Sequence, residues 1–196
     1  MGRNSLAIAS HAGKLDQLKS LVDKVVERLR KIDVLVNNAG TNFFMNTIDM
    51  TEKGWDSVMN LNLKGLFFLR QSVAKIMMEN GRGHIVNIAS ISGVKVQPSS
   101  GHYSIAKAGV IMATKVMALE WADYNIRVNC IAPGAIKTRL YDSIFSFFGE
   151  EADQAKGDFE ATIPLKRAGE PREIADAALF LSSQASQLYD RSNSGY

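Results

Sequence analysis

The sequence predicts an α/β domain in which a parallel sheet is covered by helices on both faces. Short apolar runs without polar alternation alternate with longer segments whose apolar residues recur every three or four positions. The 196 residues suffice for one hydrophobic core but not for two full domains. With 46% hydrophobic and 22% charged residues, the composition is that of a globular protein and argues against a disordered, collagen-like or membrane protein. We therefore treat residues 1–196 as one domain.

Two strand and helix pairs are expected in the first half of the chain. The long second helix has Thr51 as its N-cap and Gly81 just beyond its end, which are typical helix boundaries. The elements are a strand at 5–10, a helix at 14–30, a strand at 33–40 and a helix at 51–80.

The same alternation continues through the second half. Pro133-Gly134 ends a strand, and Pro171 suits the first turn of the last helix. The elements are strands at 84–89 and 126–132 and helices at 104–123 and 171–183.

Three strand ends are the places to search for chemistry, because open α/β sheets bind ligands beyond the carboxyl ends of their strands. They are residues 37–40, 90–93 and 133–138.

Tyr103 and Lys107 lie four residues apart, on one face of a helix that begins near them. A nearby cation and the positive end of the helix both lower the pKa of a phenol from about 10. We expect Tyr103 to be a proton donor tuned toward neutrality. A chance pairing is the alternative, since the chain has five tyrosines.

Two further polar residues occupy positions that suit a site. Ser90 ends a strand thirteen residues before Tyr103 and can face the same crevice, or it can serve only as a helix cap or turn residue. Asn62 falls in the apolar stripe of its helix, where a buried amide needs specific partners. It either organises a site through water or braces the helix.

Two loops offer backbone groups to a flat ligand. Asn37-Asn38-Ala39-Gly40 combines amides with a glycine that permits close approach, and residues 133–138 combine a possible backbone cradle with the Thr138 hydroxyl. Each is also an ordinary turn or loop when taken alone. Phe145, Phe147 and Phe148 are interpreted as either an apolar substrate lid or buried packing.

The ordered set of Asn37-Asn-Ala-Gly40, Asn62, Ser90, Tyr103-x-x-x-Lys107 and Pro133-Gly134 closely resembles the short-chain dehydrogenase/reductase family. The resemblance covers about residues 6–186. The family includes 3-oxoacyl-carrier-protein reductases and sugar or steroid alcohol dehydrogenases. It implies a Rossmann-like, doubly wound parallel sheet and NAD(P)-dependent interconversion of a secondary alcohol and a ketone or aldehyde carbonyl.

The resemblance also implies a catalytic tetrad of Asn62, Ser90, Tyr103 and Lys107. Tyr103 would protonate the substrate oxygen and Ser90 would hydrogen-bond it, while Lys107 would lower the tyrosine pKa and hold the nicotinamide ribose. Asn62 would support a water through which protons are replaced.

The cofactor contacts implied by the resemblance come from three segments. Ile136 and Thr138 would lie against the nicotinamide carboxamide, and Asn37 and Ala39 beside the adenosine. The full set is Asn37, Ala39, Gly40, Tyr103, Lys107, Pro133, Gly134, Ile136 and Thr138.

The sequence departs from the family at both ends. The family's first strand and T-G-x-x-x-G-x-G turn, which hold the cofactor pyrophosphate, have no counterpart here, and the cofactor preference cannot be read. His11 stands where the family usually has an aspartate, and a polar tail at 187–196 replaces the final strand. We expect a fold truncated at both ends that binds NAD(P) weakly. The strand at 5–10 should either pair directly with the strand at 33–40 or leave the edge of the 33–40 strand exposed.

The net charge of +3, with basic and acidic residues interleaved, makes nucleic acid an unsuitable partner. The single cysteine, Cys130, excludes an internal disulfide and multi-cysteine zinc patterns, and the three histidines lack metal-binding spacing. With no signal or membrane-spanning segment in the sequence, we expect a cytoplasmic protein without metal, acting on a small molecule as a homodimer or homotetramer. The alternative is a catalytically silent truncated paralogue or fragment that acts through subunit association.

Overall fold

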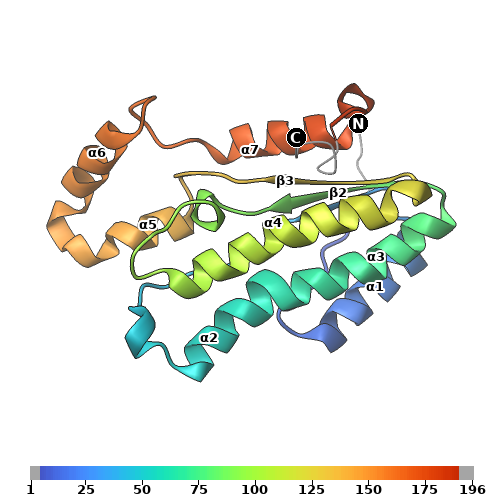
Figure 1. Ribbon diagram of the computed structural model, residues 1–196, viewed down its shortest axis with the longest axis horizontal. Coiled ribbons are helices and arrows are strands. Elements are labelled where there is room, and N and C mark those ends of the chain that lie inside the picture. Colours follow the sequence, from blue (N-terminus) through green and yellow to red (C-terminus); the bar gives the residue numbers. More distant parts are fainter. Residues whose placement is uncertain (1–4, 190–196) are drawn as a thin grey trace.

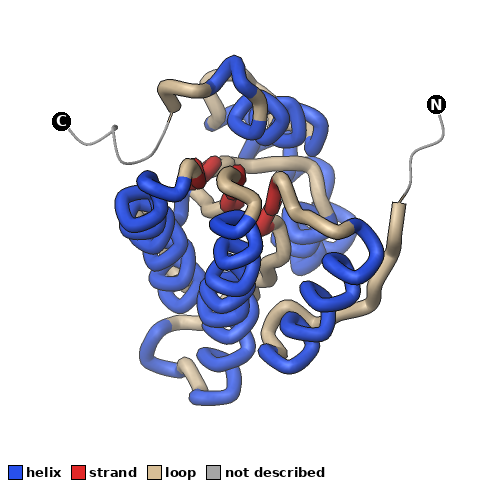
Figure 2. The backbone as a smooth tube through the Cα atoms, turned by 90° about the vertical axis from the view of Figure 1, so that its right-hand side faces the viewer, coloured by secondary structure: helices blue, strands red, loops and turns tan. Residues whose placement is uncertain are grey.

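The computed structural model describes residues 5–189 and shows a parallel sheet between layers of helices (Figures 1 and 2). In the described part of the chain the sheet has three strands in the order β1-β2-β3. They are β1 (Val34–Asn37), β2 (Gly83–Ile88) and β3 (Ile126–Ile131). Leu35 pairs with Ile85, and Ile85 pairs with Val128. All three carboxyl ends therefore lie at one edge of the sheet.

Helices cover both faces of this sheet. One face carries α3 (Leu66–Glu79) and α4 (Gly101–Trp121), with α1 (Leu15–Leu29) packed on α3, and the other face carries α7 (Pro171–Ser182) (Figure 1). The remaining elements are η1 (Thr47–Asp49), α2 (Glu52–Met59), the π-helical η2 (Asn60–Gly65), η3 (Ile91–Gly93), η4 (Ala122–Tyr124), α5 (Arg139–Phe145), η5 (Ser146–Glu151), α6 (Ala152–Thr162) and η6 (Gln184–Ser186).

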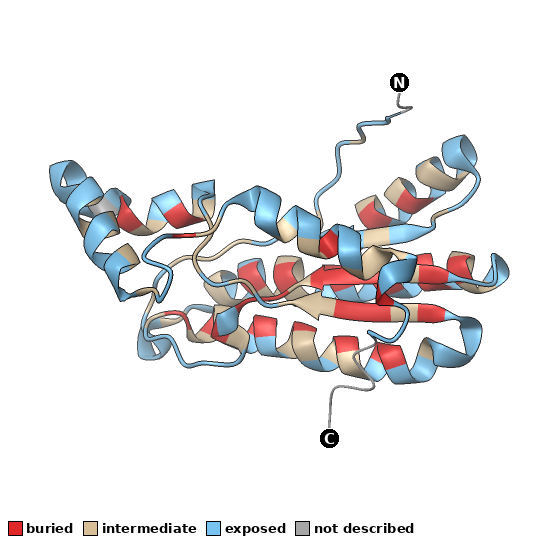
Figure 3. Cartoon of the chain, turned by 90° about the horizontal axis from the view of Figure 1, so that it is seen from above, coloured by how far each residue is buried: buried red, intermediate tan, exposed pale blue. Residues whose placement is uncertain are grey.

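The main core lies between the sheet and the α3/α4 layer, and Figure 3 shows the buried residues along the strands and the inner helix faces. Val73 and Met77 of α3 contact the same buried cluster as Ile85 and Val128. Met77 is fully buried there. No helix in residues 5–189 is long and apolar enough to cross a membrane.

The α/β fold class is confirmed, and so are the main helices and the strands from residue 33 onward. The helix expected at 51–80 is continuous, but its middle, η2, is wound as a π-helix. Gly81 beyond its end has a positive φ of 73°, a conformation that glycine adopts without strain. The helix expected at 104–123 begins earlier, at Gly101, which brings Tyr103 inside its first turn.

The strand expected at 5–10 is wrong. Those residues have no regular structure, and Leu6 is 48% exposed. A strand persists only where a neighbour satisfies its backbone groups, and this segment has no such neighbour among the described residues. Of the two arrangements expected, the exposed edge is the one found, since Val34 and Val36 of β1 are 41% and 47% exposed.

The end of the described chain is held against the sheet by Arg127 of β3. Its guanidinium donates hydrogen bonds to the carbonyl oxygens of Leu181, Ser183, Ser186 and Tyr189, at 2.8–3.1 Å. This anchor includes the first residues of the expected polar tail at 187–196. Positions 190–196 of that tail lie outside the described residues.

Candidate active site

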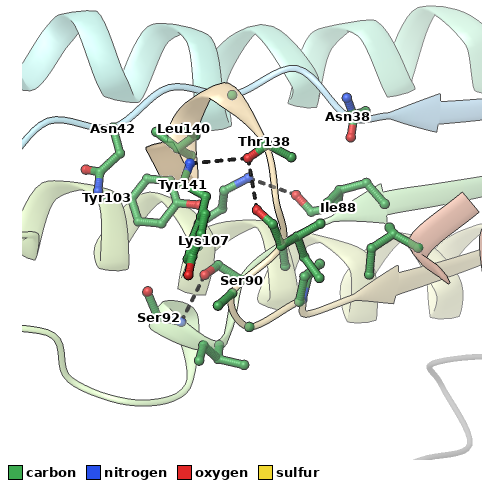
Figure 4. A pocket seen from close by; sticks show the side chains of 18 of the residues that line it. Asn38, Asn42, Ile88, Ser90, Ser92, Tyr103, Lys107, Thr138, Leu140 and Tyr141 are labelled. Atoms are coloured by element: carbon green, nitrogen blue, oxygen red, sulfur yellow. Dashed lines mark hydrogen bonds between the residues drawn. The ribbon is translucent and has the colours of Figure 1, made fainter. Parts of the chain in front are cut away.

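A cavity of about 570 Å³ opens at the carboxyl ends of the three strands (Figure 4). Its walls come from the three strand-end segments singled out in the sequence, together with α4, α5, α6 and α7. The expected site residues that line it are Gly40, Ser90, Tyr103, Lys107, Pro133, Gly134, Ile136 and Thr138. Parallel strands bring these distant segments together because their carboxyl ends share an edge.

Ser90 and Tyr103 form the polar centre of the cavity. Ser90 follows the end of β2, Tyr103 lies in the first turn of α4, and the Ser90 side chain lies near enough to the Tyr103 phenol to influence its pKa. The Ser90 hydroxyl also accepts a hydrogen bond from the Ser92 backbone N–H at 3.1 Å and so caps η3. Both roles considered for this serine are therefore present together.

Lys107 lies one helical turn after Tyr103 and is 3% exposed. Its Nζ donates to the carbonyl oxygen of Ile88 at 2.8 Å and lies 5.6 Å from the centre of the Tyr103 ring. Burial lowers the pKa of Lys107 from 10.5 to about 8; the positive charge of Arg70 adds to this and Cys130 opposes it. The ammonium is thus held beside the tyrosine by the end of β2 (Figure 4).

The expected lowering of the Tyr103 pKa is wrong in this structure. Burial raises the pKa of the phenol above 10, and the neighbouring Ser90 hydroxyl opposes this only partly. The nearby cation and the helix end follow from the sequence, whereas the loss of water around the ring depends on the folded structure. Tyr103 is consequently protonated at neutral pH, as a proton donor must be.

Asn62 is fully buried within the π-helical segment. Its Oδ1 accepts from the backbone N–H of Thr41 at 2.8 Å, and its Nδ2 donates to the Thr41 carbonyl oxygen at 2.7 Å. The amide therefore braces the loop after β1. A Cβ atom on Gly40 would lie 3.4 Å from both Asn62 Oδ1 and Lys107 Nζ, so Gly40 lies directly beside both side chains.

The β1 end presents a different asparagine to the cavity from the one expected. Asn37 points into the α4 side of the sheet, where its Nδ2 donates to Asn87 Oδ1 at 2.9 Å, and Asn87 in turn donates to Thr114 Oγ1 at 2.9 Å. Asn38, the next residue, lines the cavity, whereas Asn37 and Ala39 are absent from its described lining (Figure 4). Successive residues of a strand alternate between faces, and the motif alone did not show which face is which.

Sequence reasoning missed Arg70, a fully buried arginine on α3. Its three guanidinium nitrogens have no hydrogen-bond partner within residues 5–189, and burial lowers its pKa to about 10. Arg70 follows Asn62 by eight residues, on the same buried stripe of the helix. That spacing was the available signal.

The segment from α5 to α6 forms the outer wall of the cavity. The sequence did not predict its two helices or most of its lining residues. Tyr141 and Phe159 line the cavity. Phe145 is buried against Tyr141, as the packing alternative predicted, and Phe148 is 52% exposed. The side chain of Phe147 lies outside what the structure describes.

Comparison with known proteins places this geometry in a family. A family model described as enoyl-(acyl carrier protein) reductase matches residues 2–190. The 3-oxoacyl-(acyl-carrier-protein) reductase FabG of Thermotoga maritima is 42% identical over 171 residues, which cover 87% of this chain and 67% of that protein. The chain belongs to the short-chain dehydrogenase/reductase family.

Solved structures of short-chain dehydrogenases/reductases agree with this placement. The crystal structure of levodione reductase superposes with a TM-score of 0.89 at 34% identity, covering 93% of this chain and 71% of that one. A gluconate 5-dehydrogenase from Burkholderia cenocepacia gives a TM-score of 0.84 at 32% identity, covering 92% and 69%. This member of the short-chain dehydrogenase/reductase family is therefore an oxidoreductase by descent.

Proposed function

We propose that this chain carries the catalytic half of an enzyme that interconverts a secondary alcohol and a ketone or aldehyde carbonyl with NAD or NADP. The observation that supports the proposal most strongly is that Ser90 and Tyr103 both line the cavity, with the Ser90 side chain near enough to the phenol to lower its pKa. Two neighbouring hydroxyl groups on one wall can both reach a single carbonyl oxygen.

The nicotinamide half of the cofactor fits the residues present. Pro133 and Gly134 offer open backbone at the cavity, where a Cβ on Gly134 would meet nothing nearer than 3.7 Å. Ile136, Thr138 and Lys107 complete this part of the lining. When bound, a reduced nicotinamide supplies a hydride to the substrate carbon.

The side chains of this chain supply the proton and the orientation. Tyr103 donates its phenolic proton to the substrate oxygen, and Ser90 donates a hydrogen bond to the same oxygen. Lys107 stabilises the phenolate that remains, because its ammonium lies beside the ring. Asn62 holds the loop after β1 in place, and its water-relay role remains a proposal.

The cofactor preference stays open between NAD and NADP. The gluconate 5-dehydrogenase structure is a complex with NADP and tartrate, whereas a similar xylitol dehydrogenase is bound to NAD+. We further propose a cytoplasmic setting, in keeping with the single cysteine.

Substitution of Tyr103 by phenylalanine tests the proposal, in a fusion where a relative's glycine-rich cofactor segment precedes the chain. The ring is kept and the proton donor is removed, so carbonyl reduction should fall by about 10²- to 10⁴-fold with an unchanged circular dichroism spectrum. Tyr124→Phe, at an exposed tyrosine far along the chain, is the matched control and should keep the parent rate. A Tyr103→Phe rate within about twofold of the parent would remove Tyr103 from this role.

A further inference from the structure

The outer wall of the cavity is apolar and aromatic. Leu140, Tyr141 and Ile144 of α5 line it together with Phe159 of α6, and the ring centres of Tyr141 and Phe159 are 6.4 Å apart. Phe145 packs behind both rings, at 5.1 Å from Tyr141 and 5.7 Å from Phe159. The rings of Tyr141 and Phe159 thus form an aromatic wall that Phe145 supports from behind.

Among the side chains of these four lining residues, the Tyr141 hydroxyl is the one polar group, and it is already hydrogen-bonded within the protein. The Tyr141 hydroxyl donates to Glu160 Oε1 at 3.0 Å, and Glu160 does not line the cavity. Burial, and then this carboxylate, raise the pKa of Tyr141 to about 12. Tyr141 therefore offers the cavity its neutral ring.

Charge is nearly absent from the lining. Among the described lining residues Lys107 is the charged one, and its ammonium is bonded to Ile88 and faces Tyr103. Nearby ions pair outside the lining, as in the 3.0 Å contact of Lys156 with Asp142. A substrate carboxylate at this wall would lose its water without gaining a partner, which is strongly unfavourable.

Polar side chains near Ser90 are engaged with one another. Ser92 Oγ donates to Gln97 Oε1 at 2.8 Å, and Asn42 Nδ2 donates to Ser100 Oγ at 3.3 Å. The opposite wall differs, because the side chains of Leu140, Ile144 and Phe159 offer no hydrogen bond to a ligand hydroxyl. A polyol packed against them would lose its hydrogen bonds to water.

We propose that the carbonyl substrate is a neutral, mainly apolar ketone whose ring or alkyl part packs against Tyr141 and Phe159 while its oxygen meets Ser90 and Tyr103. This inference rests on the proposed function for the position of the carbonyl. It separates this chain from the sugar-acid and acyl-carrier substrates named for several of its relatives.

Direct binding to the 196-residue chain tests the inference without any turnover. The probes are 4-methylacetophenone, 4-acetylbenzoate, which differs only by a carboxylate in place of the methyl group, and dihydroxyacetone. Ligand-observed NMR titration should give the methyl ketone a dissociation constant at least about tenfold lower than either of the others. Equal or tighter binding of the benzoate or the triose, or no binding of the methyl ketone at millimolar concentration, would overturn it.

Three variants locate the binding. Phe159→Ala should weaken methyl ketone binding by about five- to twentyfold, whereas Phe148→Ala, at an exposed aromatic of the same segment, should leave it unchanged. Leu140→Arg adds a cation to the wall and should shift the preference toward 4-acetylbenzoate. Identical affinities in all three variants would place the ligand elsewhere. Because these readouts need no cofactor, failure of hydride transfer in the fusion protein is a separate result.

Discussion

Two buried cations stand close enough to influence each other at the base of the site. Arg70 and Lys107 are 0% and 3% exposed, and the charge of Arg70 helps to lower the pKa of Lys107. The Lys107 ammonium donates its hydrogen bond to the Ile88 carbonyl rather than to a carboxylate. An ammonium in this position costs folding free energy, which is consistent with a functional role.

Lys107→Met should remove a pH dependence of stability. Between about pH 8 and 10.5 the unfolded chain holds a proton that folded Lys107 has lost, so the parent becomes more stable as pH rises through this window. The penalty at neutral pH is on the order of 3 kcal/mol, and the methionine variant should recover much of it. Urea unfolding at pH 7.5, 8.5 and 9.5 measures the slope.

Lys24→Met, at an exposed lysine of α1, controls for the loss of a surface charge and should keep the parent's slope. If the Lys107 variant shows the same rise of stability with pH as the parent, the titrating group is a different one.

At the scale of elements, the run from α2 through α3 depends on a glycine in its π-helical turn. A Cβ on Gly65 would overlap the carbonyl oxygen of Ala12, so the loop before α1 lies directly on the helix backbone. The same turn carries Asn62, whose amide braces the loop after β1. The π-helical turn thus joins the site to the start of the described chain.

Gly65→Ala should destabilise the protein by about 1–3 kcal/mol or more, because the Ala12 backbone has to move away. Gly157→Ala in α6 is the matched control: its Cβ would meet nothing within 4 Å, and alanine should stabilise by about 0.5–1 kcal/mol. Thermal unfolding of both variants distinguishes the two glycines. Equal shifts would show that the Ala12 contact is not maintained in solution.

At the scale of the whole molecule, a second hollow of about 590 Å³ runs between η2, α3 and α4. Phe67 and Phe68 are 39% and 40% exposed there, and Met112 and Val116 are 59% and 43% exposed. We propose that a second copy of the chain covers this surface.

Self-association should therefore be visible at micromolar concentration. Multi-angle light scattering is expected to give the mass of a dimer or tetramer, and Met112→Glu should shift it toward the monomer because a carboxylate would be buried unpaired at the contact. Val94→Glu, at an exposed residue outside the hollow, should leave the mass unchanged. A monomeric parent would contradict the proposal.

The 196-residue polypeptide should bind NADH and NADPH weakly or not at all. Its cavity serves the nicotinamide half, but no glycine-rich turn opens a helix beside β1 in residues 5–189, and α1 begins at an exposed Lys14 cap without a side-chain hydrogen bond. The anionic pyrophosphate would lack backbone donors. Calorimetric titration decides this, and micromolar affinity for either cofactor would make the prediction wrong.

The sequence by itself determined the three strands from residue 33 onward, the helices at 51–80, 104–123 and 171–183, and the Tyr103 and Lys107 pairing, because these depend on periodicity and on residues four apart. It also placed Ser90 and the Pro133-Gly134 loop at strand ends, and parallel strands share one such edge. These features are local, or follow from chain topology alone. The sequence did not predict α5 or α6.

Only the tertiary structure decided which side chains face the cavity and how burial and neighbouring charges shift their pKa values. Asn38 rather than Asn37 lines it, burial outweighs the cation at Tyr103, and Arg70 acts on Lys107 from a neighbouring helix. The apolar segment at 5–10 forms no strand because no neighbour satisfies its backbone. Burial, side-chain direction and strand pairing depend on neighbours distant in the chain, and no local pattern contains them.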